Sequence, residues 1–415
     1  MNWYIPRIIN NYEFTDLLLG KGAFAIVKSA VHIPTKETVA IKIIPKSLIR
    51  ENPQLIMQLN REVQALTQCD HPFIVKFFDF FEDKHFFYIV QEYVNHGTLL
   101  ESVNARGHLT EKQCRKYFCQ ILSAICYLHN KNILHRDLKA ENILLDSGDN
   151  IRLVDFGLCK IFEQNEDKYT STLCGSFTYA APEVIQGQKY SLSADVWALG
   201  VLLYAISNCQ LPWEDENNKK LCQKIMYTEP NYPSSFSPSL IDLLSKMLKK
   251  NPEERITIKE IQCHPWVAQN SCIPNALQQF DNIEILNKLE SLGFSKEEVI
   301  RNLKEGKRIS ETISFEILRR SKMTELLNDK NTLQPPFKAL KSLSDRTINT
   351  QLPILNLNKP CCRLSVPTAR RLSTAEIRDA GTASNAALKF SRLLNLQKKR
   401  PKRNPFIAHS LASYE

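Results

Sequence analysis

One short segment constrains this chain more than any other feature, because it puts a carboxylate, a cation and an amide side by side. Residues 135–142 read HRDLKAEN, and residues 155–157 read DFG shortly afterwards. Magnesium prefers carboxylate, amide and phosphate oxygens, so Asn142 and Asp155 are candidate metal ligands. Asp137 is a candidate base, and the neighbouring cation suits a phosphate-bearing substrate.

Two segments near the amino terminus also indicate a phosphate ligand. Residues 20–27 (GKGAFAIV) place glycines where a backbone could approach phosphate oxygens closely, although a plain hairpin explains them as well. Lys42 ends the motif VAIK on a predicted strand, and an inward-facing lysine needs an anionic partner. Glu62 and nucleotide phosphates would supply it, whereas a solvated strand lysine is the alternative.

The hydrophobic periodicity divides the chain into a strand-rich part and a helix-rich part. Apolar and β-branched runs predict strands at residues 14–19, 26–32, 39–44, 74–81 and 85–91, with a helix at 54–67. After Gly97 the apolar residues recur at helical spacing, and helices are expected to about residue 267. The fold class is therefore predicted to be α+β.

Together with Glu183 in APE, residues 195–200 (DVWALG) and Arg255, these motifs resemble the eukaryotic protein kinases. The resemblance covers residues 12–267. It implies a bilobal kinase fold with a small β-rich lobe at 12–94 and a large helical lobe at 95–267. It also implies transfer of the γ-phosphate of ATP, with Mg²⁺, to a hydroxyl group of a protein substrate.

The resemblance also implies a role for each matching residue. Lys42 is expected to hold the α- and β-phosphates and to pair with Glu62. Asp137 is expected to accept the proton of the substrate hydroxyl, while Lys139 neutralises the γ-phosphate and the two candidate metal ligands bind magnesium. The other nucleotide contacts implied are Leu19, Gly20, Lys21, Gly22, Ala23, Phe24, Ala25, Ile26, Val27, Ala40, Glu92, Val94 and Leu144.

Lys139 and Ser176 stand where the resemblance implies a kinase of the serine/threonine class. Thr98 and Ala205 occupy positions where basophilic relatives carry carboxylates, although Glu141 remains. We therefore expect at most a modest demand for upstream arginine in the substrate.

Thr172 stands two residues before Cys174-Gly175, where the AMP-activated kinases have their activating threonine. Arg136 and Lys160 occupy positions that face the phosphate in active relatives. A phosphate added by an upstream kinase would pair with these cations and order the loop.

Residues 179–183 and 264–266 resemble the calcium/calmodulin-dependent and AMP-activated kinase branch. Residues 289–300 read helix, Gly-Phe turn, helix, and resemble the ubiquitin-associated-like domain that follows the microtubule-affinity-regulating and AMP-activated kinases. This domain is expected at 280–321, where it would tune the catalytic domain rather than bind ubiquitin. A generic helical hairpin packed on the large lobe is the alternative.

Two rival functions come from other classes. A pseudokinase scaffold would bind partners without phosphate transfer, but the catalytic set of this chain has no missing member. A ubiquitin adaptor would act through residues 282–321, which a ubiquitin pull-down would reveal.

The end of the chain is basic. Residues 335–415 hold fifteen Lys or Arg against four Asp or Glu, so they carry +11 and the rest of the chain carries −1. Many Pro, Ser, Thr and Asn predict low order for the tail at 330–415. Residues 398–403 (KKRPKR) would bind an import receptor or an anionic surface, or form a solvated charge run. Stacking aromatics are absent nearby, so specific nucleic-acid binding is not expected.

Twelve cysteines show no disulfide framework or zinc-ligand spacing, which indicates reduced thiols. The expected location is the cytoplasm, with the nucleus as the alternative if the basic run is an import signal.

Overall fold

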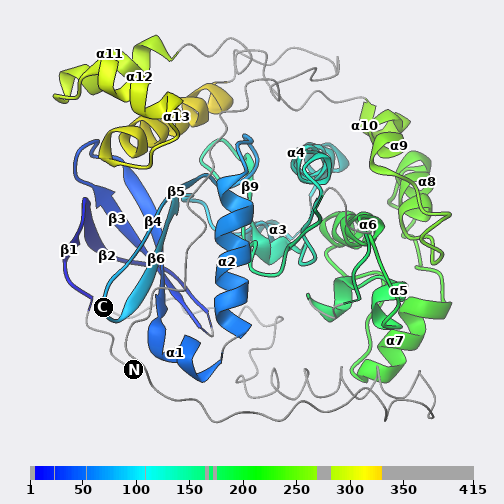
Figure 1. Cartoon of the computed structure of the whole chain (residues 1–415). Coiled ribbons are helices and arrows are strands. Elements are labelled where there is room, and N and C mark those ends of the chain that lie inside the picture. The colour runs from blue at the N-terminus through cyan, green and yellow to red at the C-terminus, as the bar shows by residue number, and fades with distance from the viewer. Residues whose placement is uncertain are drawn as a thin grey trace, which may run out of the picture.

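The computed structural model describes residues 5–22, 24–52, 54–107, 109–163, 168–171, 175–268 and 282–329. Ala23, Thr172 and the basic tail lie outside these residues. The described chain forms a strand-rich lobe beside a helix-rich lobe, with three further helices stacked on the strand-rich lobe (Figure 1). The predicted bilobal α+β fold is confirmed.

The small lobe is built on an antiparallel sheet in the order β1-β2-β3-β4-β6-β5. Its strands are β1 (Ile8–Ile9), β2 (Tyr12–Lys21), β3 (Ile26–His32), β4 (Thr38–Pro45), β5 (Phe77–Glu82) and β6 (Phe86–Glu92). One face buries Val39, Ile41 and Ile43 of the central strand β4. Because side chains alternate along a strand, Ala40 and Lys42 point to the opposite face.

Two helices follow β4. The short α1 (Lys46–Glu51) was not predicted, whereas α2 (Gln54–Thr67) has the predicted bounds. Helix α2 buries Leu55, Leu59 and Leu66 on one side, and Glu62 lies on the same side. A carboxylate on the buried face of an amphipathic helix needs a partner, which the small-lobe sheet supplies.

The large lobe packs helices around α6, whose residues are apolar on all sides and mostly buried. Its helices are α3 (Leu99–Arg106), α4 (Glu111–Asn130), α5 (Pro182–Ile185), α6 (Ser193–Asn208), α7 (Asn218–Tyr227), α8 (Pro238–Met247), α9 (Ile258–Cys263) and α10 (Pro265–Ala268). Two small sheets pair β7 (Ile133–Leu134) with β10 (Lys160–Ile161), and β8 (Ile143–Leu145) with β9 (Ile151–Leu153). Within the described residues, no helix combines the length and apolar character needed to cross a membrane.

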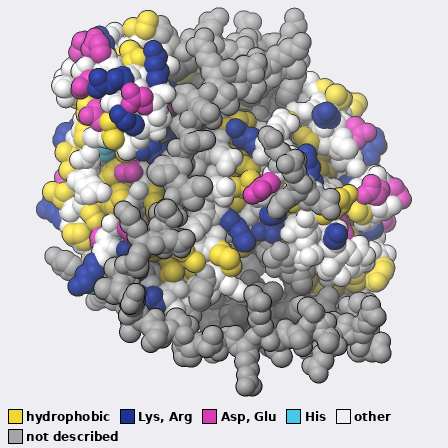
Figure 2. All heavy atoms as spheres, viewed as in Figure 1, with side chains coloured by type: hydrophobic (Ala, Val, Ile, Leu, Met, Phe, Trp, Pro, Cys, Tyr) yellow, Lys and Arg dark blue, Asp and Glu magenta, His cyan; other side chains and the backbone are white. Residues whose placement is uncertain are grey.

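The carboxyl-terminal helices are α11 (Ile283–Ser291), α12 (Lys296–Lys304) and α13 (Ser310–Asn328). The predicted helix-turn-helix is present, with Gly293 at φ +92° in the turn, but α13 continues beyond the expected boundary at residue 321. Phe315 and Leu318 of α13 pack with α11 and α12, while Ile313 and Ile317 pack into the small lobe. Acidic and basic side chains intermix over the outer face of these helices (Figure 2).

Candidate active site

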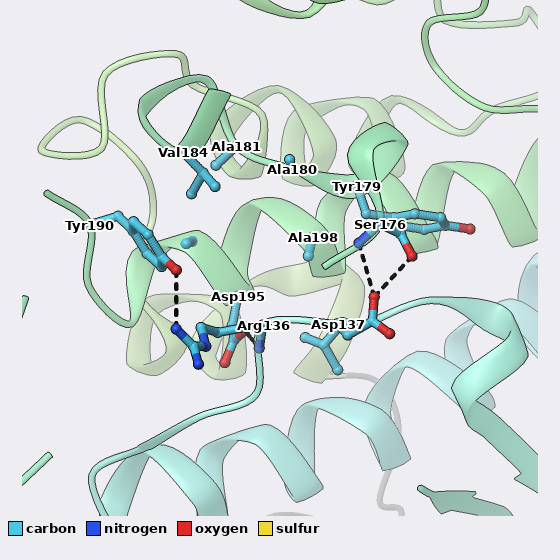
Figure 3. Close-up of a pocket in the computed structure, with 12 residues that line it drawn as sticks. Arg136, Asp137, Ser176, Tyr179, Ala180, Ala181, Val184, Tyr190, Asp195 and Ala198 are labelled. Carbon is cyan, nitrogen blue, oxygen red and sulfur yellow. Dashed lines mark hydrogen bonds between the residues drawn. The ribbon is translucent and has the colours of Figure 1, made fainter. Parts of the chain in front are cut away.

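The Asp137 carboxylate is the centre of the candidate site. Its Oδ2 accepts hydrogen bonds from Lys139 Nζ at 2.7 Å and Asn142 Nδ2 at 2.9 Å. Its Oδ1 accepts from Ser176 N at 3.0 Å and Ser176 Oγ at 2.9 Å (Figure 3). Burial alone would raise the pKa of Asp137, but the charge of Lys139 and the hydrogen bonds outweigh burial and lower it. The carboxylate is therefore ionised and aimed into the site.

The loop that carries Asp137 is held by a buried carboxylate on α6. Asp195 accepts hydrogen bonds from the backbone N–H groups of His135 at 2.9 Å and Arg136 at 3.0 Å. His129 Nε2 lies 2.9 Å from the same carboxylate. Asp195 is 1% exposed, so this loop is attached to the core of the large lobe. The rigid support explains how a loop can present its side chains in one geometry.

Gly175 makes the approach of Ser176 to Asp137 possible. Its φ is +88°, and a Cβ at this position would lie 2.2 Å from the carbonyl oxygen of Arg136. Only glycine fits such a contact in the left-handed region. The hydroxyl of Ser176 also accepts a hydrogen bond from Lys139 Nζ at 2.9 Å. The side chains of Asp137, Lys139 and Ser176 are thus in mutual contact.

Lys42 and Glu62 meet across the space between β4 and α2. The Nζ atom lies 2.6 Å from Oε1 and 2.7 Å from Oε2 of Glu62. Burial would lower the pKa of Lys42, but the carboxylates of Glu62 and Asp155 outweigh burial and raise it. Lys42 therefore remains a cation in the site. The alternative of a solvated strand lysine does not hold for this residue.

The apolar side chains implied to contact adenine come from β2, β3 and β4 of the small lobe and from β8 of the large lobe. Leu19, Val27 and Leu144 are half-buried, and Ala40 is 9% exposed. The glycine-containing segment closes a hairpin between β2 and β3, with a hydrogen bond from Gly22 N to Ala25 O at 2.8 Å. The remaining members of this hairpin are Gly20, Lys21, Phe24 and Ile26.

Asn142 and Asp155 remain the candidate ligands for a magnesium ion, and the structure shows how Asn142 is oriented. The Nδ2 group of Asn142 donates to the main-chain and side-chain oxygens of Asp137, both at 2.9 Å. This orientation leaves the amide oxygen as the ligand atom. No cluster of three His, Cys, Asp or Glu suited to a metal occurs among the residues that the structure describes. A metal here would therefore need phosphate or water oxygens as further ligands, which is the usual arrangement for Mg²⁺.

Arg136, one of the two expected phosphate-binding cations, can be located relative to the described residues on either side of 172–174. Arg136 donates to the carbonyl oxygens of Leu158 and Cys159, and its Nη1 lies 3.5 Å from the hydroxyl of Tyr190 (Figure 3). Lys160 is opposite Leu134 in the β7–β10 pair, and Leu134 directly precedes the loop that carries Asp137. Thr170 pairs with Tyr190 through two backbone hydrogen bonds. The chain on both sides of residues 172–174 therefore runs close to Arg136.

A small cavity of about 30 Å³ adjoins Asp137. It is lined by Ser176 and Tyr179 on one side and by Val184, Tyr190 and apolar residues of α6 on the other.

Sequence reasoning did not find the charge network behind Glu92. The Glu92 carboxylate is 8% exposed and accepts hydrogen bonds from Arg152 Nε at 2.8 Å and Arg320 Nε at 2.7 Å. The signal available was an arginine inside the apolar strand β9, where a charge requires a partner. Val94 follows Glu92 and is half-buried.

Comparisons with known proteins agree with this geometry. The protein kinase domain family matches residues 14–267. The chain is 36% identical over 365 residues to SNF1-related protein kinase catalytic subunit alpha KIN12 of Arabidopsis thaliana, covering 85% of this chain and 72% of that one. It is 38% identical to serine/threonine-protein kinase SIK2 of Gallus gallus and to maternal embryonic leucine zipper kinase of Xenopus tropicalis. Those matches cover 72% and 65% of this chain, but only 38% and 41% of the relatives.

Proposed function

This chain belongs to the protein kinases, in the AMP-activated-kinase-related serine/threonine branch, and we propose that it transfers the γ-phosphate of Mg-ATP to serine and threonine hydroxyls of proteins. One observation carries the proposal. The cation Lys139 and the candidate metal ligand Asn142 both donate to Oδ2 of the candidate base Asp137, at 2.7 Å and 2.9 Å. That arrangement suits the transfer of a phosphoryl group to a hydroxyl nucleophile, because phosphoryl transfer depends mainly on positioning and charge neutralisation.

Each residue has a definite task in this proposal. Lys42, held by Glu62, orients the α- and β-phosphates. Asp137 accepts a hydrogen bond from the substrate hydroxyl. It takes the proton as the hydroxyl oxygen bonds to the γ-phosphorus and the bond from that phosphorus to the bridging oxygen breaks, which releases ADP. Lys139 stabilises the negative charge on the transferred group. A magnesium ion bound by Asn142 and Asp155 would supply further charge neutralisation at the phosphates.

Exchange of Asp137 for asparagine tests the proposal. Asp137 accepts from donors on both of its oxygens, so either orientation of an amide puts an NH₂ group against another donor. We expect kcat with a serine peptide to fall by about 10²–10⁴-fold in Asp137→Asn, since general-base catalysis contributes that much. Asp242→Asn, the same change at a surface position of α8, is the control. An Asp137→Asn enzyme that transfers phosphate at the wild-type rate would remove Asp137 from the mechanism.

Phosphorylation of Thr172 by an upstream kinase is the proposed means of activation. Support comes from Arg136, which lies next to the chain entering and leaving residues 172–174, and from its charge. We expect Thr172→Ala to reduce peptide phosphorylation strongly while ATP still binds, and mass spectrometry of active enzyme to find phosphate on Thr172. Full activity in the alanine variant would mean that the loop orders without phosphate.

The helices after the catalytic lobes are proposed to act on those lobes, rather than as a ubiquitin receptor. Ile313 and Ile317 are buried with small-lobe residues, and Arg308 donates to the carbonyl oxygen of Phe78 at 2.7 Å. Removal of residues 282–321 would expose this apolar surface, so we expect lower activity or a lower melting temperature. Tight binding of ubiquitin to the full chain, together with an unchanged rate in the deletion variant, would reverse the assignment.

A further inference from the structure

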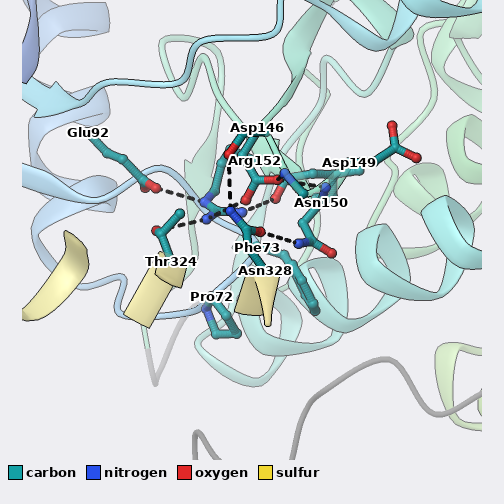
Figure 4. A network of polar contacts seen from close by, with 12 residues as sticks. Pro72, Phe73, Glu92, Asp146, Asp149, Asn150, Arg152, Thr324 and Asn328 are labelled. Atoms are coloured by element: carbon teal, nitrogen blue, oxygen red, sulfur yellow. Dashed lines mark hydrogen bonds and ion pairs between the residues drawn. The ribbon is translucent and has the colours of Figure 1, made fainter. Parts of the chain in front are cut away.

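Helix α13 runs along the junction between the two lobes. Near its start, Ile313 and Ile317 are buried in the small lobe. Near its end, Leu327 belongs to the apolar cluster that fills the large lobe and extends into the small lobe. Asn328 Oδ1 accepts a hydrogen bond from Asn150 Nδ2 of the large lobe at 2.8 Å (Figure 4). The helix is therefore attached to both lobes and crosses the segment that connects them.

Arg320, in the middle of α13, contacts that connecting segment directly. Its Nε and Nη2 atoms each lie 2.7 Å from Oε2 of Glu92, the last residue of β6. Oε1 of the same carboxylate accepts from Arg152 of the large lobe at 2.8 Å, and Arg152 Nη2 donates to Thr324 Oγ1 of α13 at 3.1 Å (Figure 4). The Glu92 side chain is thus shared between α13 and the large lobe.

The other donors of Arg320 hold the loop that leads into β5. Its guanidinium donates to the carbonyl oxygens of His71 at 3.1 Å, Pro72 at 3.1 Å and Ile74 at 2.7 Å. Arg320 is 3% exposed, so these contacts are not open to water. A guanidinium can make this set because its donors form a rigid planar fork, which a lysine lacks.

Electrostatics make Glu92 dependent on both arginines. Burial alone would raise the pKa of Glu92, but the charges of Arg152 and Arg320 outweigh burial and lower it. The second carboxylate in the network is Asp146, whose Oδ2 lies 3.1 Å from Arg152 Nη2. Two buried cations therefore face two buried carboxylates, and removal of one cation leaves an uncompensated charge beside the connecting segment.

We propose that Arg320 is a positioning residue for nucleotide binding, acting through Glu92 on the backbone of residues 92–94. The inference rests on the proposed function, in which this backbone contacts the adenine. Arg320 touches neither the nucleotide nor the reacting atoms. It fixes both the side chain of Glu92 and the 71–74 loop, so the backbone between the lobes is already in its binding geometry before a nucleotide arrives. Such preorganisation raises affinity because less order has to be imposed on binding.

The test compares Arg320→Gln with Arg319→Gln in the full chain. Arg319 is the adjacent arginine on α13; it pairs with Asp70 at 2.6 Å and with Glu316 at 3.3 Å. Calorimetry with a non-hydrolysable Mg-ATP analogue gives Kd without any phosphate transfer, and peptide assays give KM for ATP and kcat. We expect Kd and KM to rise about tenfold in Arg320→Gln, equivalent to about 1.4 kcal/mol. In Arg319→Gln both should stay within twofold of wild type.

Measuring Kd and KM together with kcat and the calorimetric stoichiometry distinguishes a positioning role of Arg320 from a role in folding stability alone. If Arg320 only supported folding, its loss would lower the number of active molecules, so apparent kcat and the calorimetric stoichiometry would fall at unchanged KM and Kd. That result, or an equal Kd in the two glutamine variants, overturns the proposal.

Arg320→Lys keeps a positive charge next to Glu92 but lacks the planar set of guanidinium donors. This variant tests the proposal if Arg320→Gln does not fold. We expect about a threefold rise in its Kd, between wild type and Arg320→Gln, and an unchanged Kd overturns the proposal. If wild-type protein binds the analogue but transfers no phosphate to any peptide, the proposed function fails while the Kd comparison still tests Arg320.

Discussion

Gly175→Ala is the change for which the structure gives the clearest expected magnitude. The new Cβ would lie 2.2 Å from Arg136 O, whereas real Cβ atoms stay at least 3.0 Å away, so the chain has to move by about 0.8 Å. The same change forces a side chain into the left-handed region, at about 1–2 kcal/mol. Ser176 follows directly and would be carried away from Asp137 and Lys139.

A displacement near 1 Å in a catalytic constellation lowers the rate by about 10²-fold. We therefore expect kcat for peptide phosphorylation to fall by about that factor in Gly175→Ala. The assay is steady-state kinetics with Mg-ATP and a serine peptide, alongside thermal unfolding to measure stability.

Gly107→Ala is the matched control. Gly107 follows α3 with φ +66°, and a Cβ there meets nothing within 4 Å. It should have the same backbone strain and a similar loss of stability, but a kcat within twofold of wild type. Equal kcat values in the two alanine variants would refute the argument that Gly175 sets the position of Ser176.

Three further outcomes can be measured. In Lys139→Met the pKa of Asp137 should rise, because burial is no longer opposed by the lysine charge, so the acid limb of the kcat/KM profile should move to higher pH; an unmoved limb would contradict this. Arg255→Met leaves Glu183 buried without its bidentate partner at 2.7 Å and 2.9 Å. Urea titration should therefore show a free energy of unfolding lower by about 3–5 kcal/mol, and a decrease below about 1 kcal/mol would contradict the reasoning. A fluorescent reporter fused to residues 398–403 should enter the nucleus if the basic run is an import signal; a cytoplasmic reporter would leave the solvated charge run standing.

Local patterns predicted the elements that are amphipathic over several turns or bounded by turn residues. Strand β3 and helix α2 have the expected bounds, since alternation and helical periodicity are clear in both. Helix α1 spans only Lys46–Glu51, which is too short for a periodic signal. The strand expected from residue 74 begins at Phe77, because Ile74 instead forms an isolated bridge with Leu153 of the large lobe.

The candidate site was predictable where its residues are close in sequence, as in the loop from His135 to Asn142. Glu92 and Arg320 are 228 residues apart, and no local pattern connects them. The sequence pattern also could not locate the end of α13, because this helix packs on more than one side. Its residues face α11 and α12, the small lobe and the large lobe in turn, so it has no single apolar stripe.

The attachment of α13 to the small lobe has a consequence for synthesis on the ribosome. The Arg320 contacts with His71 and Pro72 join positions 249 and 248 residues apart, so the lobe that is made first is completed by the last helix that the structure describes. At ordinary elongation rates of about 5–20 residues per second, the interval is about 10–50 s. We expect the nascent small lobe to remain protease-sensitive until α13 emerges. Chains arrested with α13 still inside the exit tunnel and with α13 fully outside it would show the difference, and equal resistance in both would contradict it.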